Sequence, residues 1–195
     1  MSFLTQNIED VKAMLPHLQA LEPQVNAAAA AIERSLLAGG KLLSCGNGGS
    51  AADASHLTTE FVCRFDKDRK PYAALSLAAH GGDLTAIGND YCFEDIFARQ
   101  VEAFGRTGDV LTAFTTSGQS ENIYRALLVA RQCRVISIAF LGKDGGKCAG
   151  LADVELIVPG TITARIQEGH KLLLHTICET VERGLEPRNI DEYYH

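Results

Sequence analysis

From residue 41 onward, short apolar segments alternate with segments of helical periodicity, and this alternation constrains the fold more than any other feature. Five apolar segments are predicted to be strands, at Lys41–Cys45, Ala73–Leu77, Asp109–Phe114, Val135–Phe140 and Val154–Val158. Helices are predicted between and after them, at Ala51–Phe65, Gly82–Asn89, Phe93–Phe104, Ser120–Cys133 and Thr163–Arg183. The pattern predicts an α/β three-layer sandwich, in which a five-stranded parallel sheet is flanked by helices.

Residues 1–40 contain no predicted strand and are expected to form a helical hairpin. The segment Asn7–Leu21 carries one apolar stripe at helical spacing, formed by Ile8, Val11, Leu15 and Leu18. A second helix begins at Pro23, and Gly39–Gly40 ends it. A chain of 195 residues has the size of one domain, so we expect a single domain over 1–195. It would consist of the hairpin at 1–40, an α/β core at 41–185 and a tail at 186–195.

The composition is that of a globular protein, with 46% hydrophobic and 22% charged residues. A formal net charge of -6 disfavours nucleic acids and anionic membranes, so we expect neither as a partner. The first residues lack the basic start of a signal peptide, and no apolar run reaches membrane-spanning length. The six cysteines form no C-x-x-C pair, which favours reduced thiols in a cytoplasmic protein and disfavours a zinc site built from cysteines.

Two turns rich in glycine or hydroxyl groups each follow a predicted strand, where ligands of parallel sheets bind. Gly46–Ser50 contains three glycines, which let backbone amides approach a ligand closely. Thr115–Ser120 has four hydroxyl groups and opens a helix, whose free N–H groups and dipole favour an anion such as phosphate. The first turn alone is equally consistent with a tight structural loop, and Ser120 alone with a helix cap. Neither turn matches the Walker or the dinucleotide-binding pattern.

His56 and Glu60 lie four residues apart on a predicted helix and therefore share one face. An imidazole and a carboxylate are a common pair of divalent-metal ligands, although a surface ion pair has the same spacing. Gln167 and His175 lie on the last predicted helix, about 80° and 12 Å apart. One ion would contact both only if it lay between them. His175 taken alone is better interpreted as a core or interface histidine.

Several motifs resemble, in their order and spacing, those of the phosphoheptose isomerases, a family of SIS (sugar isomerase) domain proteins. They are Cys45–Ser50, His56 with Glu60, Gly88–Asp90, Thr116–Gly118, Gly142–Lys147 and Arg165–Glu168 with His175. The resemblance implies the flavodoxin-like SIS fold and a homotetramer with active sites at subunit interfaces. It also implies the conversion of D-sedoheptulose 7-phosphate to D-glycero-D-manno-heptose 7-phosphate, the first step towards the nucleotide-activated heptose of surface polysaccharide.

The resemblance also implies a role for individual residues. The implied ligands of a zinc ion are His56, Glu60, Gln167 and His175. The implied sugar-phosphate contacts are Asn47, Gly48, Gly49, Ser50, Glu60, Asn89, Asp90, Thr115, Thr116, Ser117, Ser120 and Gln167, with Arg64 and Arg165 as supporting basic groups. Glu60 would take the C1 proton on the way to an enediol(ate), and His175 would move protons at the sugar oxygens. Zinc would polarise the carbonyl group.

The chain departs from the family pattern in the second turn. Thr115 and Gln119 stand where the family usually has serine and asparagine, and the threonine keeps the hydroxyl group. The alternatives to this enzyme are a non-catalytic SIS-domain adaptor, a sugar-phosphate sensor and an isomerase of another ketose phosphate. The presence of all four implied zinc ligands favours the enzyme.

Overall fold

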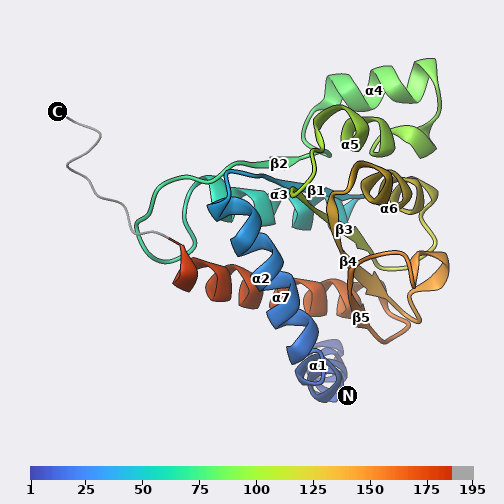
Figure 1. The fold of residues 1–195 in the computed structure, drawn as a ribbon. Helices are drawn as coiled ribbons and strands as arrows, with labels where there is room; N and C mark the ends of the chain where they lie inside the picture. The colour runs from blue at the N-terminus through green and yellow to red at the C-terminus, as the bar shows by residue number, and fades with distance from the viewer. Residues whose placement is uncertain (186–195) are drawn as a thin grey trace.

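A computed structural model describes residues 1–185, and the tail expected at 186–195 lies outside the described residues. Five strands form one parallel sheet in the order β2-β1-β3-β4-β5, which confirms the predicted fold class (Figure 1). The strands are β1 Leu42–Gly46, β2 Ala74–Ser76, β3 Val110–Thr115, β4 Ile136–Gly142 and β5 Val154–Val158. In this order the chain changes direction across the sheet between β1 and β3, and such a switch point forms the ligand crevice of flavodoxin-like folds.

Helices cover both faces of the sheet. They are α1 Phe3–Gln19, α2 Glu22–Leu37, α3 Gly49–Val62, α4 Gly81–Asp90, α5 Ala98–Phe104, α6 Glu121–Cys133 and α7 Thr163–Gly184. One apolar core lies between the sheet and α1, α2, α3 and α7, and a second lies between the opposite face and α4, α5 and α6 (Figure 1). The strands are therefore buried on both faces, as parallel strands usually are.

Three predicted helices differ from the structure by more than one residue at an end. The first begins at Phe3 instead of Asn7, because the Ser2 side chain accepts a hydrogen bond from the Thr5 N–H (3.2 Å) and caps the helix. The helix predicted at 93–104 is interrupted, since a 3₁₀ turn at Phe93–Asp95 precedes α5. The third difference concerns α3, which ends at Val62 rather than Phe65 because the N–H groups of Phe65 and Asp66 donate to the side chain of Glu182 on α7.

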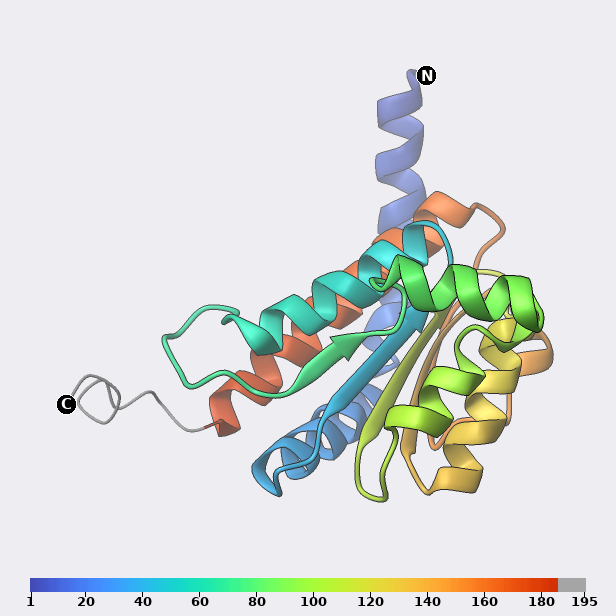
Figure 2. The same ribbon diagram turned by 90° about the horizontal axis from the view of Figure 1, so that it is seen from above.

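The two N-terminal helices are joined through Ala20 and Leu21 and pack in different ways. Helix α2 lies on α7 and on the sheet, whereas α1 contacts α7 and β5. Figure 2 shows α1 projecting beyond the rest of the molecule. No helix within residues 1–185 is long and apolar enough to cross a lipid bilayer.

Candidate functional site

The two turns expected to bind a ligand lie next to each other at the switch point of the sheet. Strands β1 and β3 are neighbours, with Gly46 in register with Phe114, and α3 and α6 follow them on opposite faces. The Asn47 amide donates to Asn122 Oδ1 (2.9 Å), and the Asn122 amide donates to Asn47 Oδ1 (2.8 Å). Asn122 is only 2% exposed. This reciprocal pair joins the turn after β1 to the first turn of α6, and sequence reasoning missed it because Asn122 lies outside the hydroxyl-rich motif.

The hydroxyl groups of the turn after β3 converge on Thr115. Its Oγ1 atom lies 3.1 Å from Ser120 Oγ and 3.4 Å from Ser117 Oγ, and Ser117 Oγ accepts the N–H of Gln119 (3.1 Å). Ser120 occupies the N-cap position of α6, but its side chain makes no capping hydrogen bond. The capping alternative for Ser120 is therefore not realised. The hydroxyl groups and the first N–H groups of α6 together provide donors for an anion.

The shape of this turn is fixed by the neighbouring turn after β4. Gly118 has a φ angle of +66°, and a Cβ atom at this position would lie 2.1 Å from the carbonyl oxygen of Gly145. The Cys148 N–H donates to the carbonyl of Gly118 (3.1 Å). Backbone groups of the turn after β4 therefore pack against this turn and bond to it, which restrains its conformation.

The glycine turn after β1 contains both packed and open positions. A Cβ atom on Gly46 would lie 2.4 Å from the Ser50 carbonyl oxygen, and one on Gly49 would lie 2.3 Å from Nε2 of Gln167. Gly48 has a φ angle of +55°, and an added Cβ atom would meet nothing within 4 Å. Packing thus explains Gly46 and Gly49, whereas the open side at Gly48 leaves room for a ligand. Gln167 lies over the beginning of α3, beside this turn.

A second polar group lies between α3 and α7, which run side by side (Figure 2). Nε2 of His56 lies 3.1 Å from Oε1 of Glu60 and 3.0 Å from Nε2 of His175. Burial lowers the pKa of His175 below its ordinary value, and the nearby His56 and Lys171 lower it further. The three side chains form a contact chain, Glu60–His56–His175, that we call the histidine cluster.

The donor types of the histidine cluster fit a zinc ion. Zinc–nitrogen bonds of about 2.0–2.1 Å place neighbouring ligand atoms of a tetrahedral site about 3.3 Å apart. The contacts of His56 with Glu60 and His175, at 3.1 and 3.0 Å, are close to this spacing. Within residues 1–185, however, no three or more histidine, cysteine, aspartate or glutamate side chains already surround a single point. An ion would therefore need the side chains on either side of His56 to close around it.

Between Gln167 and the histidine cluster, α7 carries Lys171 and His170, which contact α3 and β4. Lys171 Nζ lies 2.7 Å from Asp53 of α3. His170 is fully buried, and its Nε2 atom lies 3.1 Å from the carbonyl oxygen of Leu141 at the end of β4. Burial lowers the pKa of His170 to about 4 and outweighs the opposing hydrogen bond, so the ring is neutral at pH 7. His170 is a core histidine that attaches α7 to the sheet.

Four other residues expected at the site form hydrogen bonds within their own segments. Asn89 and Asp90 are exposed at the end of α4, where the Asn89 amide donates to Asp90 (2.8 Å). Arg64 is exposed and donates to the carbonyl of Asp66, and Arg165 is paired with Glu168. Among the hydrogen bonds of residues 1–185, none joins these four residues to Asn47 or to the hydroxyl groups of Thr115–Ser120.

The two parts of the site are separated along α3. The helix begins at Gly49, next to the turns, and Glu60 follows eleven residues later, which corresponds to a rise of about 16 Å. Gln167 and His175 are separated in the same direction on α7, since Gln167 meets Gly49 and His175 meets His56. The structure thus brings the expected site residues together in two groups. One group lies at the two turns, and the other, the histidine cluster, lies farther along the axes of α3 and α7.

Comparison with known proteins adds an independent finding. The sequence profile of the SIS domain matches residues 6–142. The phosphoheptose isomerase of Paramagnetospirillum magneticum is 54% identical over 153 residues, which are 78% of this chain and 80% of that protein. The phosphoheptose isomerase of Clostridium acetobutylicum is 43% identical over 97% of this chain and 96% of its own length. The solved structure of phosphoheptose isomerase from Neisseria gonorrhoeae superimposes with a TM-score of 0.86 at 40% identity, covering 92% of this chain and 97% of that one.

Proposed function

The chain belongs to the phosphoheptose isomerases of the SIS domain family, and we propose that it converts D-sedoheptulose 7-phosphate to D-glycero-D-manno-heptose 7-phosphate. Membership makes it a sugar-phosphate isomerase that interconverts an aldose and a ketose. The contact chain Glu60–His56–His175 between α3 and α7 is the main support for the residue roles proposed below. The product would supply nucleotide-activated heptose for surface polysaccharide.

The reaction moves a proton from C1 to C2 through an enediol(ate), and it needs a base at carbon and an acid–base group at oxygen. We assign the carbon step to Glu60, whose Oε1 atom faces His56 and whose other oxygen is left for the proton. We assign the oxygen step to His175. Its pKa is lowered by burial and by His56, which favours a neutral imidazole that can accept a proton and return it.

The phosphate group would bind where the two turns meet. Its oxygens would accept hydrogen bonds from the hydroxyl groups of Thr115, Thr116, Ser117 and Ser120 and from the first N–H groups of α6. The remaining proposed substrate contacts are Asn47, Gly48, Gly49, Ser50, Asn89, Asp90 and Gln167. The contacts with the phosphate would supply binding and orientation rather than chemistry, because the phosphate lies at the far end of the substrate from the reacting carbons.

A zinc ion is part of the proposal because its ligands would come from the histidine cluster. His56, Glu60 and His175 would hold it, and Gln167 would be the fourth ligand after turning away from Gly49. When bound, zinc supplies a Lewis acid that polarises the sugar carbonyl. Removal of metal by a chelator should lower activity, and added zinc should restore it.

We propose that a second copy of the chain completes each active site. A seven-carbon phosphate spans about 10 Å from phosphorus to C1 when extended at about 1.2 Å per bond. The start of α3 lies about 16 Å from Glu60 in the same chain, so one substrate molecule does not suit both parts. The phosphate turns of one chain and the histidine cluster of another would then act together, in a homotetramer with interfacial sites.

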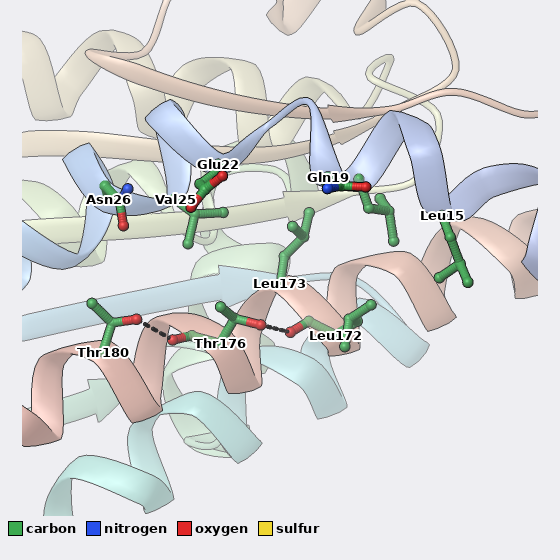
Figure 3. A pocket seen from close by; sticks show the side chains of 10 residues that line it. Leu15, Gln19, Glu22, Val25, Asn26, Leu172, Leu173, Thr176 and Thr180 are labelled. Carbon is green, nitrogen blue, oxygen red and sulfur yellow. Dashed lines mark hydrogen bonds between the residues drawn. The ribbon is translucent and has the colours of Figure 1, made fainter.

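The surface of α1 and α7 supports this assembly. A groove of about 540 Å³ lies between α1, α2 and α7, and Leu15, Val25, Leu172 and Leu173 are among its apolar lining residues (Figure 3). Leu15 and Leu172 are exposed, as are Phe3, Leu4 and Ile8 farther along α1. An apolar surface of this kind on a projecting helix indicates a protein partner, and the incomplete site makes a second copy the partner of choice.

The cysteines support a cytoplasmic location. All six are free thiols, at Cys45, Cys63, Cys92, Cys133, Cys148 and Cys178. Free thiols persist in a reducing compartment, whereas disulfides are typical of secreted proteins. We therefore propose that the reaction takes place in the cytoplasm.

The purified protein should be assayed with ketose phosphates of five, six and seven carbons, with the products identified by NMR. We expect kcat/KM for sedoheptulose 7-phosphate to exceed the others by at least about tenfold, because phosphate and C1 must reach both parts of the site at once. Light scattering should give four times the chain mass of 21.0 kDa. Equal rates with shorter sugars would contradict the proposed substrate, and a monomer with full activity would contradict the interfacial site.

A further inference from the structure

The segment that follows α3 is held against the end of α7 by one buried ion pair. Nε of Arg69 lies 3.2 Å from Oε1 of Glu182, and these residues are only 4% and 7% exposed. Neither residue has a role in the reaction proposed above. A buried pair can be replaced by apolar side chains without loss of stability in many proteins, so stability alone is a weak reason for this one.

Glu182 fixes the segment through its backbone. Its carboxylate accepts hydrogen bonds from the N–H groups of Phe65 (3.0 Å), Asp66 (2.8 Å) and Lys67 (3.0 Å). Burial by itself raises the pKa of Glu182, but the three N–H donors and Arg69 outweigh burial and lower it, which keeps the group ionised. His175 lies seven residues earlier on α7, which is two turns away on the same face.

Arg69 fixes the end of α3 through its carbonyl groups. Nη2 donates to the carbonyl of Glu60 (2.5 Å), and Nη1 donates to the carbonyl of Phe61 (3.0 Å). Carbonyls in the last turn of a helix have no partner within the helix, so the guanidinium group acts as a cap. The guanidinium group of Arg69 thus bonds the carbonyl of Glu60, the residue proposed to take the C1 proton. The same group is also bonded to Glu182 of α7.

The same segment also touches His175 directly. The ring of Phe65 lies 5.8 Å from the ring of His175, measured between centroids, and the Phe65 N–H is one of the three donors to Glu182. One connected set of contacts therefore runs from Glu60 through Arg69 and Glu182 to Phe65 and His175.

We propose that Arg69 and Glu182 are positioning residues, which hold Glu60 of α3 and His175 of α7 in the relative placement that proton transfer requires. The proposal rests on the roles assigned to Glu60 and His175 in the proposed function. A planar guanidinium group can bond Glu60, Phe61 and Glu182 simultaneously, and a lysine cannot. Arg69→Lys should therefore impair the reaction although it keeps the charge.

The test compares Glu182→Gln with a matched variant, Asp109→Asn. Asp109 is also a buried carboxylate, 3% exposed, which accepts N–H groups from Lys41 (3.0 Å) and Arg106 (2.8 Å) and pairs with the Lys41 ammonium group. It lies at the start of β3, at the opposite edge of the sheet from the turns. Both variants lose a buried charge that holds backbone N–H groups, so both should lower stability.

Only Glu182→Gln should affect the chemical step. We expect its kcat to fall about 10–100-fold, the usual effect of losing a group that orients a reacting side chain, while KM changes less than about twofold. Asp109→Asn should keep both constants. Equal losses of kcat in the two variants, or an unchanged kcat in folded Glu182→Gln, would overturn the proposal. If Glu182→Gln fails to fold, Arg69→Lys is compared with Lys41→Arg by the same criteria.

A second measurement separates this proposal from the proposed function. Side-chain NMR spectra of histidine rings do not depend on turnover. We expect the ring signals of His56 and His175 to shift in Glu182→Gln and to keep their positions in Asp109→Asn. Unshifted signals in Glu182→Gln would overturn the positioning role whatever the activity, whereas failure of the wild type to isomerise sedoheptulose 7-phosphate would overturn only the proposed function.

Discussion

The turn at Thr115–Ser120 and the histidine cluster are built in opposite ways. The turn lies within one strand–turn–helix unit, and its hydroxyl groups meet over at most five positions of the sequence. In the cluster, His56 and His175 come from two helices and are 119 residues apart. The hydroxyl groups of the turn come from one short segment whose backbone conformation is restrained. The histidine cluster forms only when α3 and α7 pack against each other.

This difference indicates a division of labour between the two regions. A turn held in shape by backbone contacts is suited to binding, because it is ready for the phosphate before the substrate arrives. A cluster assembled by long-range packing places reactive groups accurately only with support from outside, such as the contact of Arg69 with Glu182. Changes in the turn should therefore act on KM, and changes in the cluster should act on kcat.

The largest effect is expected from a pair of variants, one in each region. His175→Asn should lower kcat about 100–1000-fold and leave KM nearly unchanged, because a general acid–base group is lost. Ser120→Ala should instead raise KM about tenfold with a nearly unchanged kcat, since one donor to the phosphate is lost. Steady-state kinetics of both variants would show whether one changes kcat and the other changes KM. A fall of kcat in Ser120→Ala as large as in His175→Asn would remove the distinction.

A smaller effect is expected from two glycines with positive φ angles. Gly118→Ala should lower the free energy of unfolding by about 3 kcal/mol, because the new Cβ atom is both strained and in collision with the Gly145 backbone. Gly48→Ala should cost only about 1 kcal/mol, as its Cβ atom would point into open space. Urea unfolding would measure both. Equal losses would show that the hydroxyl turn is no more rigid than the glycine turn.

Protonation of the buried His170 at acid pH should lower the free energy of unfolding of the whole domain, and therefore the stability of both regions. The pKa of His170 is 6.5 in an unfolded chain and is lowered by burial to about 4 in the folded protein. Between these two pH values the unfolded state binds more protons than the folded state. The contribution of neutral His170 to the free energy of unfolding is therefore complete above pH 6.5 and is lost as the pH falls towards 4. The loss amounts to about 3 kcal/mol.

Urea unfolding of the wild type and of His170→Gln between pH 7.5 and 4 would measure this effect. The variant should lack this part of the pH dependence. The lowered pKa of Glu182 acts in a separate range, since that contribution is lost only as the pH falls below about 4.5. Parallel curves for wild type and variant would contradict the role given to His170.

The smallest effect is expected from the amide pair between the two turns. Asn122→Ala leaves the Asn47 side chain, a proposed substrate contact, without the partner that orients it. We expect KM to rise about tenfold, which corresponds to about 1.4 kcal/mol of lost substrate binding. The value of kcat should change little, because Asn122 contacts no member of the histidine cluster. Isothermal titration with inorganic phosphate would measure binding directly. An unchanged phosphate affinity would show that the two turns bind independently.

The sequence predicts the local parts of this protein well. The five strands, the parallel sheet and the two turns follow from short segments whose periodicity and turn residues can be recognised without knowledge of the fold. The spacing of about 80° and 12 Å between Gln167 and His175 on one helix leaves open whether both contact one ion, and the structure puts one residue at Gly49 and the other at His56.

The parts that depend on packing could not be predicted. Nothing near Arg69 in the sequence shows that it caps α3, and the spacing of Glu182 from His175 gives only a shared helix face. For the same reason α3 was expected to continue to Phe65, whose N–H in fact donates to Glu182. Asn122 was overlooked because its partner, Asn47, lies 75 residues away.

The central claim is that Glu60 removes the C1 proton, and hydrogen exchange with solvent tests it most directly. Sedoheptulose 7-phosphate would be incubated in D₂O with wild-type protein or with Glu60→Gln and followed by proton NMR. We predict that the wild type introduces deuterium at C1 of the ketose or C2 of the product, and that Glu60→Gln introduces none above the background rate while still binding the substrate. Exchange by Glu60→Gln at the wild-type rate would contradict the account.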